Sequence, residues 1–295
     1  MCENAVNARV PVAVPGARGS SPLLKKVAGA VAATAALGAA TAAYGHFIEL
    51  NNFQLRTESL PVLPAGSPDF RILHISDMHM IPGQQKKIDF MHSLAALEPD
   101  LVMNTGDNLS HVDGMGPLLE ALDPLMDFPG VFVPGSNCYF APVFKNPARY
   151  LWQPRTPQMI EEGSRVALPI ERMHEAFESR GWTGLVNRYD TLNLKGLRLE
   201  FSGVDDPHLR YDEHPGFAPG AFDEGQEPSV RIGVAHAPYM RTLYRFVQDG
   251  AQAIFAGHTH GGQVCLPGGH ALVSNCDLPP SRAKGVSEQS GIPVQ

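Results

Sequence analysis

Cysteine, charged residues and basic side chains are all scarce in this sequence, and each shortage excludes a class of protein. Four cysteines in 295 residues are too few for a scaffold held together by disulfides. Charged residues make up 18% of the chain and hydrophobic residues 43%, which excludes a disordered protein and provides for a sizeable core. The 29 glycines and 26 prolines follow no period, which excludes a collagen-like chain and indicates structured loops.

The net charge of −7 is unevenly distributed along the chain. Residues 1–48 hold four of the 23 Lys and Arg residues but one of the 30 Asp and Glu residues, so the rest of the chain is strongly acidic. Nucleic acid binds surfaces rich in Lys and Arg, and we therefore expect no nucleic-acid partner. An acidic body does suit a site whose positive charge comes from bound metal.

The first 50 residues contain an apolar segment, residues 27–48, without Asp, Glu, Lys or Arg. As a helix it would be about 33 Å long, enough to cross a hydrocarbon core of about 30 Å. Ten of its residues are alanine, so three interpretations stay open: a membrane anchor, a cleaved signal peptide and an Ala-rich soluble helix. Lys25 and Lys26 precede the segment, and by the positive-inside rule the first two interpretations place residues 49–295 outside the cytoplasm.

The sequence divides into five parts by composition. They are a basic tail (1–26), the apolar segment as anchor or signal (27–48), a linker with three prolines (49–68), a folded domain (69–278) and a polar tail (279–295).

Strand and helix patterns alternate through the folded domain. Strands are expected over 71–76, 101–104, 131–133, 231–235 and 253–256, a hairpin over 191–194 and 197–201, and helices over 84–98, 117–128, 170–180 and 239–248. Residues 140–169 have no period and several prolines, and we interpret them as a long loop facing the substrate. The alternation predicts an α/β fold with parallel strands covered by helices.

Side chains that can bind metal follow the ends of five of these strands. They are Asp77 with His79, Asp107, Asn137, His236, and His258 with His260. Because the carboxyl ends of strands form one rim of an α/β sheet, we expect the five loops to converge. Two carboxylates, an amide and four imidazoles suit a pair of divalent transition-metal ions such as Mn, Fe or Zn.

The candidate ligands lie in five short blocks: D-x-H, G-D, a turn similar to G-N, H-x-P and G-H-T-H-G-G. These blocks resemble those of the calcineurin-like metallophosphoesterase superfamily. All five occur in the expected order over about residues 71–265. The apolar segment and proline-containing linker before ILHISDMH also resemble a membrane-anchored bacterial branch of that family. The resemblance implies a four-layer α/β/β/α sandwich of two mixed sheets, here with an N-terminal hydrophobic helix.

The resemblance also implies a role for each ligand. Asp77, His79 and His260 would hold one ion, Asp107 would bridge both, and Asn137, His236 and His258 would hold the other. The family reaction is hydrolysis of a phosphoester, in which a hydroxide shared by the two ions attacks phosphorus in line.

The third block departs from the family pattern. It reads Gly135-Ser136-Asn137-Cys138, whereas the family reads G-N-H-D or G-N-H-E, so the family's catalytic histidine has no match. Aligned without a gap, Ser136 takes the place of the ligand asparagine; with a slip of one residue, Asn137 does. We favour the slip, because an amide oxygen is a better ligand than a neutral hydroxyl. The proton donor would then be a metal-bound water or a nearby histidine such as His111.

Other features carry weaker expectations. His74 is interpreted as a packed core histidine, and His208 as part of a solvated loop, with a substrate-facing position as the alternative. The chain ends 35 residues after His260 in a polar tail, so we expect the last strands of the second sheet to be missing.

Three functions therefore remain in competition. The first is a phosphoester hydrolase acting outside the cytoplasmic membrane. The second is a phosphodiesterase or pyrophosphatase for a lipid-linked or nucleotide-sugar substrate, since the branch includes enzymes acting on UDP-diacylglucosamine. The third is a non-catalytic metal-binding scaffold, which the complete ligand set disfavours.

Overall fold

The computed structural model describes residues 22–143, 165–219, 229–262, 264–266 and 270–295. The chain divides into two compact units, residues 1–54 and residues 55–295. The first unit contains helix α1 (Pro22–Phe47) and a short 3-10 helix, η1 (Glu49–Asn51). The stretch Lys25–Asn51, with mean hydropathy 1.5, is long and apolar enough to cross a membrane, a test that signal sequences also pass.

The second unit contains a first sheet of four strands in the order β1-β2-β3-β4. The strands are β1 (Ile72–Ile75), β2 (Leu101–Asn104), β3 (Gly130–Phe132) and β4 (Thr183–Gly184), and all their pairings are parallel. The helices between them are α2 (Gln85–Ser93) with η2 (Leu94–Leu97), α3 (Met115–Leu122), the short α4 (Ser136–Tyr139) and α5 (Ile170–Ser179).

The second sheet has six strands in the order β11-β12-β8-β7-β6-β5. They are β5 (Arg188–Leu194), β6 (Leu197–Gly203), β7 (Ser229–Ala235), β8 (Ala253–Ala256), β11 (Ser287–Gln289) and β12 (Ile292–Val294), with α6 (Met240–Gln248) between β7 and β8. The pairings β5–β6 and β11–β12 are antiparallel and the others parallel. A separate hairpin pairs β9 (Val264–Leu266) with β10 (His270–Val273), and η5 (Pro280–Arg282) follows it.

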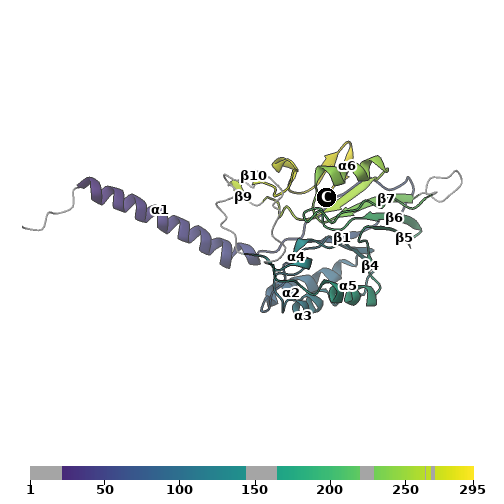
Figure 1. The fold of residues 1–295 in the computed structure, drawn as a ribbon, viewed down its shortest axis with the longest axis horizontal. Helices are drawn as coiled ribbons and strands as arrows, with labels where there is room; N and C mark the ends of the chain where they lie inside the picture. Colours follow the sequence, from purple (N-terminus) through teal and green to yellow (C-terminus); the bar gives the residue numbers. More distant parts are fainter. Residues whose placement is uncertain (1–21, 144–164, 220–228, 263, 267–269) are drawn as a thin grey trace, which may run out of the picture. The chain divides into compact units, whose positions relative to one another are not determined.

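Three apolar clusters join the layers of the second unit. Figure 1 shows these layers, with α2, α3 and α5 on one side of the two sheets and α6 on the other. In β2, Val102 packs toward α2, α3 and α5, whereas its neighbours Leu101 and Met103 pack between the two sheets, as the twofold alternation of a strand requires. On the far side of the second sheet, Phe246 of α6 packs against Gly233 of β7. The order of layers is thus helices, sheet, sheet, helix.

The α/β fold with two sheets is confirmed, with one difference in detail. We expected two mixed sheets, and the second sheet is mixed, but the first is parallel in every pairing between the strands that the structure describes. The strands at 101–104 and 253–256 begin and end where the sequence pattern places them. Most of the long loop expected over 140–169 lies outside the described residues.

The expectation for the end of the chain is wrong. Residues 287–294, interpreted as part of a polar tail, form β11 and β12 and extend the second sheet. The β12 strand pairs with β8 through Val294 and Ile254, and Ala256 N–H donates to Gln295 O at 2.7 Å. Val294 is 4% exposed and belongs to the cluster under α6. A short strand with few apolar residues still extends the sheet, because its backbone forms hydrogen bonds with the open edge of β8.

This placement predicts a large difference between two identical substitutions. Val294→Asp should lower the free energy of unfolding by about 3 kcal/mol or more, because it buries an unpaired charge. Val286→Asp, at an exposed valine nearby, should change it by less than about 1 kcal/mol. Urea unfolding of both variants measures the difference. Equal, small effects would show that the end of the chain is solvated.

Candidate metal centre

The five loops converge at the carboxyl ends of the strands, as expected. Asp77 and His79 follow β1, Asp107 follows β2, and the backbones of the two loops bond to each other: Asp77 N–H donates to Gly106 O and His79 N–H to Asp107 O, both at 2.9 Å. The loops after β7 and β8 are joined by Gly257 N–H, which donates to His236 O at 2.8 Å. Six of the seven predicted ligands form two triads, whose potential ligand atoms lie within 4.8 Å of one another in each: Asp77, His79 and His260, and Asp107, His236 and His258.

The first triad centres on Oδ1 of Asp77, whereas the other oxygen of this carboxylate, Oδ2, is hydrogen-bonded to the protein. Its Oδ2 accepts hydrogen bonds from Ser76 Oγ at 2.6 Å and from His258 N–H at 2.8 Å. Its Oδ1 is buried without a hydrogen bond and lies 3.2 Å from His260 Nε2. Nε2 of His79 is 3.2 Å from the same nitrogen. One carboxylate oxygen and two imidazole nitrogens therefore face a common point.

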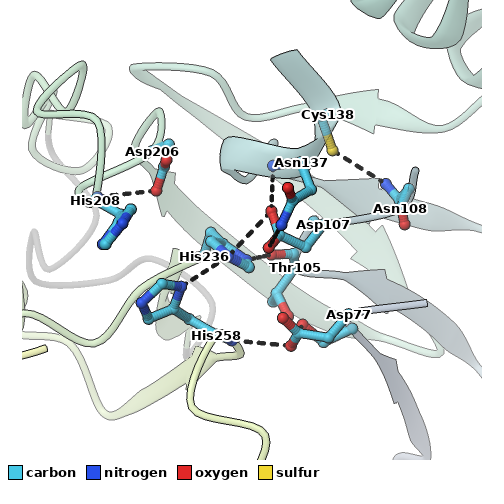
Figure 2. A network of polar contacts seen from close by, with 12 residues as sticks. Asp77, Thr105, Asp107, Asn108, Asn137, Cys138, Asp206, His208, His236 and His258 are labelled. Atoms are coloured by element: carbon cyan, nitrogen blue, oxygen red, sulfur yellow. Dashed lines mark hydrogen bonds and ion pairs between the residues drawn. The ribbon is translucent and has the colours of Figure 1, made fainter. Parts of the chain in front are cut away.

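The second triad surrounds the other carboxylate, Asp107 (Figure 2). Asp107 Oδ1 is 3.3 Å from His236 Nε2, which in turn is 3.3 Å from His258 Nδ1. Asp107 Oδ2 is 3.8 Å from His79 Nε2 in the first triad. The two oxygens of one buried carboxylate thus face different triads.

Asn137, the seventh predicted ligand, also contacts Asp107. Its backbone N–H donates to Asp107 Oδ1 at 2.7 Å and its Nδ2 donates to Oδ2 at 2.8 Å (Figure 2). An amide carries both a donor and an acceptor, so the group that holds Asp107 can also offer an oxygen to an ion. The next residue, Cys138, falls at the position of the family's histidine under the slip but does not replace it as an acid, because burial raises the pKa of its thiol to about 12.

The spacing of the ligand atoms fits metal ions. Ligands at about 2.0–2.1 Å from one ion lie about 2.9–3.4 Å apart in tetrahedral or octahedral geometry, and two pairs of ligand atoms in each triad lie 3.2 or 3.3 Å apart. Imidazole nitrogens this close to each other repel unless a cation or a proton lies between them. The buried Oδ1 of Asp77, without a hydrogen bond, lacks the partner that a cation would provide.

The far side of three of the four imidazoles is held by the protein. His236 Nδ1 is 2.7 Å from Thr105 O, His79 Nδ1 is 2.9 Å from Ser110 Oγ, and His258 Nε2 is 3.3 Å from Asn275 O. Such contacts select the tautomer and aim the other ring nitrogen at the metal. None of these three partners is identifiable from the sequence, because none belongs to a recognisable block.

The backbone at the ligands is strained. Asp77, His79, Asp107, His258 and His260 all have φ between +46° and +68°, in the left-handed region that residues other than glycine rarely adopt. Strain of this kind concentrates at functional sites, where the surrounding structure maintains it. Gly135 has a related role: a Cβ at this position would collide with the side chains of Asp107 and His236. The glycine that begins the third block is therefore needed for the close approach of the loops.

The site is electrostatically suited to cations. Burial raises the pKa of the Asp77 and Asp107 carboxyls, but the neighbouring His260 and His236 outweigh it and hold both pKa values well below the usual range. Burial lowers the pKa of His236, yet Asp107 raises it more, to about 10. Burial lowers the pKa of His258 to about 3, which leaves that imidazole neutral, the form that binds metal. Burial lowers the pKa of His260, yet Asp77 raises it more, so the two carboxylates attract positive charge, which a pair of metal ions would supply in place of the two protons.

Three other histidines test the sequence interpretation. His74 is a packed histidine, as expected: it bonds to Thr105 Oγ1 at 2.9 Å, and burial lowers its pKa to about 4. His111 has a 49% exposed side chain, and its Nδ1 accepts a hydrogen bond from Asp113 N–H, so its role as proton donor stays a prediction. His208 is half-buried rather than solvated, and its ring centre is 4.6 Å from that of His258.

Comparison with known proteins gives the same assignment. The profile of the calcineurin-like phosphoesterases (Metallophos) matches residues 70–262, a range that includes all seven predicted ligands. The chain belongs to this family of phosphoesterases. It is 27% identical over 213 residues to the uncharacterized protein YpbG of Bacillus subtilis (strain 168), covering 71% of this chain and 69% of that protein. One crystal structure aligns with 76% of this chain and 88% of its own, at 12% identity and a TM-score of 0.39.

The contact between Asn137 and Asp107 generates a test of the third block. Asn137→Ala should lower the metal content of the purified chain from about two equivalents toward one, whereas Ser136→Ala should keep both ions. Metal analysis by mass spectrometry, together with turnover of an aryl phosphate, measures both. If Ser136→Ala loses an ion and Asn137→Ala does not, the gapless alignment is correct and ours is wrong.

Proposed function

We propose that this chain is a phosphoester hydrolase that uses two divalent metal ions and acts outside the cytoplasmic membrane. One observation carries the proposal: two ligand triads face the two oxygens of a single buried carboxylate, Asp107, in a chain of the calcineurin-like phosphoesterase family. Asp77, His79 and His260 would hold one ion, and His236, His258 and Asn137 the other.

The ions would supply Lewis acidity for the phosphoryl oxygens and would lower the pKa of bound water. The chain's own residues set where this happens. Asp107, 3% exposed, keeps the two triads at a fixed separation, and Asn137 orients it through two hydrogen bonds. Thr105 and Ser110 orient His236 and His79 from behind. The site therefore provides rigid positioning of charge, which is the main requirement for transfer of a phosphoryl group.

The proposed location rests on α1 and the charges before it. A helix of 26 residues is about 39 Å long, and a window within it has the hydropathy of a membrane span. Lys25 and Lys26 at its start favour a cytoplasmic N-terminus and an external catalytic unit. A membrane-anchored hydrolase would meet a phosphoester substrate at or near the membrane, including a lipid-linked one.

Loss of the bridging carboxylate should abolish activity. The full chain, purified in detergent and loaded with Mn²⁺ or Zn²⁺, should hydrolyse an aryl phosphate monoester or diester and lose this activity in excess chelator. Asp107→Asn should reduce turnover at least about 100-fold, since even the partners behind metal ligands are worth 10–100-fold. Asp113→Asn, at an exposed carboxylate in the same loop, is the matched control and should retain activity.

The relative rates of hydrolysis of the aryl phosphate monoester and diester also distinguish the competing functions. Preference for the diester would favour the phosphodiesterase or pyrophosphatase alternative. A wild-type chain that holds two ions but hydrolyses neither ester would support the scaffold. Turnover that survives chelation or Asp107→Asn would rule out the metal-dependent reaction altogether.

The external location predicts access by protease. Protease added to intact spheroplasts should digest residues 55–295 while a cytoplasmic marker protein survives, and the chain should sediment with membranes. Protection until lysis would contradict the orientation. Recovery of the chain from the medium with an N-terminus near residue 43 would instead identify a cleaved signal peptide.

A further inference from the structure

His208 lies at the edge of the second triad, although none of the five sequence blocks includes it. It follows β6 in the loop Asp205-Asp206-Pro207-His208, and its ring is tilted 43° to that of His258, with the centres 4.6 Å apart. Figure 2 shows it beside His258 and Asp206. A half-buried imidazole at this distance from a predicted ligand lies next to the second triad.

The loop that carries His208 is held rigidly. The buried carboxylate of Asp206 accepts hydrogen bonds from the backbone N–H groups of His208 at 2.9 Å and of Leu209 at 3.2 Å. The preceding carboxylate, Asp205, accepts a hydrogen bond from Tyr139 Oη at 2.7 Å, which joins the loop to the helix of the third block. The backbone of His208 is thus fixed relative to Asn137, two residues before Tyr139.

The imidazole itself is oriented by Tyr239. Nδ1 of His208 is 3.0 Å from Tyr239 Oη. Burial raises the pKa of Tyr239 above its usual value, so the phenol stays protonated and can donate to Nδ1. In that arrangement the imidazole proton lies on Nε2. Arg241 fixes the tyrosine in turn: its guanidinium lies 4.8 Å from the centre of the Tyr239 ring and donates to Pro207 O at 2.8 Å.

We propose that His208 binds the substrate by donating a hydrogen bond from Nε2 to a phosphoryl oxygen, and that Tyr239 positions it. This inference rests on the proposed phosphoester hydrolysis. It accounts for the third block, in which the family's histidine is missing: an imidazole reaches the second metal site from the loop after β6 instead. His111, the alternative suggested by the sequence, is directed to Asp113 at the surface.

Binding of inorganic phosphate, the product of the proposed reaction with a monoester, tests the role of His208. In the Mn²⁺-loaded full chain, His208→Ala should weaken phosphate binding about 10- to 100-fold, the range for a hydrogen bond to a charged group, without loss of metal. His208→Gln, which keeps a donor, should recover part of the affinity. Tyr239→Phe should give an intermediate loss, with metal content unchanged. Calorimetry for phosphate and mass spectrometry for metal measure these effects, and aryl phosphate turnover should fall in parallel.

Each alternative result identifies which claim has failed. Wild-type affinity for phosphate in His208→Ala would overturn the inference and leave the proposed hydrolase intact. Loss of a metal ion in His208→Ala would also overturn the inference, because His208 would then be a support for His258. Weakened phosphate binding in His111→Ala but not in His208→Ala would overturn it as well. A wild-type chain that binds phosphate but hydrolyses neither ester would overturn the proposed function, while the affinities of the variants would still decide the role of His208.

Discussion

The structure around the site depends on one buried carboxylate. Asp107 is 3% exposed, and an isolated charge at that depth would be strongly unfavourable. It is stabilised by hydrogen bonds from Asn137 and by imidazoles on two sides, His236 at 3.3 Å and His79 at 3.8 Å. These groups come from loops after β1, β3 and β7, and Asp107 itself follows β2, so the charge of one side chain requires strands of both sheets to end at the same place.

The scaffold explains how such a site can be maintained. Left-handed backbone at five ligand residues and a close approach at Gly135 are both unfavourable in isolation. They persist because the strands beneath the loops are fixed by apolar packing, above all by residues such as Met103 and Phe201 between the two sheets. Rigid strands and strained loops together hold ligand atoms at the separations that metal ions require. Tyr139 and Tyr239, which follow β3 and β7, contact the loop after β6 and hold His208 beside the second triad.

The sequence predicted the parts of the structure that depend on local pattern. Apolar runs bounded by turn residues predicted β2 and β8 to the residue, and the positions of Asp and His residues after strands predicted that their loops converge. The division of these residues into two triads was what the family resemblance implied. Two features depend on distant contacts and were missed. β12 has little apolar pattern of its own and forms because β8 offers an open edge. His208 looked like a loop residue, since its partners Tyr239 and His258 lie far along the chain.

The central claim is that Asp107 lies between two metal ions, and anomalous diffraction tests it most directly. Crystals of the chain grown with Mn²⁺ or Zn²⁺, with data collected at the absorption edge of the metal, should show two peaks about 3.5–4 Å apart. One peak should lie within the triad of Asp77, His79 and His260, the other within that of Asp107, His236 and His258, with an Asp107 oxygen adjacent to each. A single peak, or peaks away from Asp107, would contradict the account.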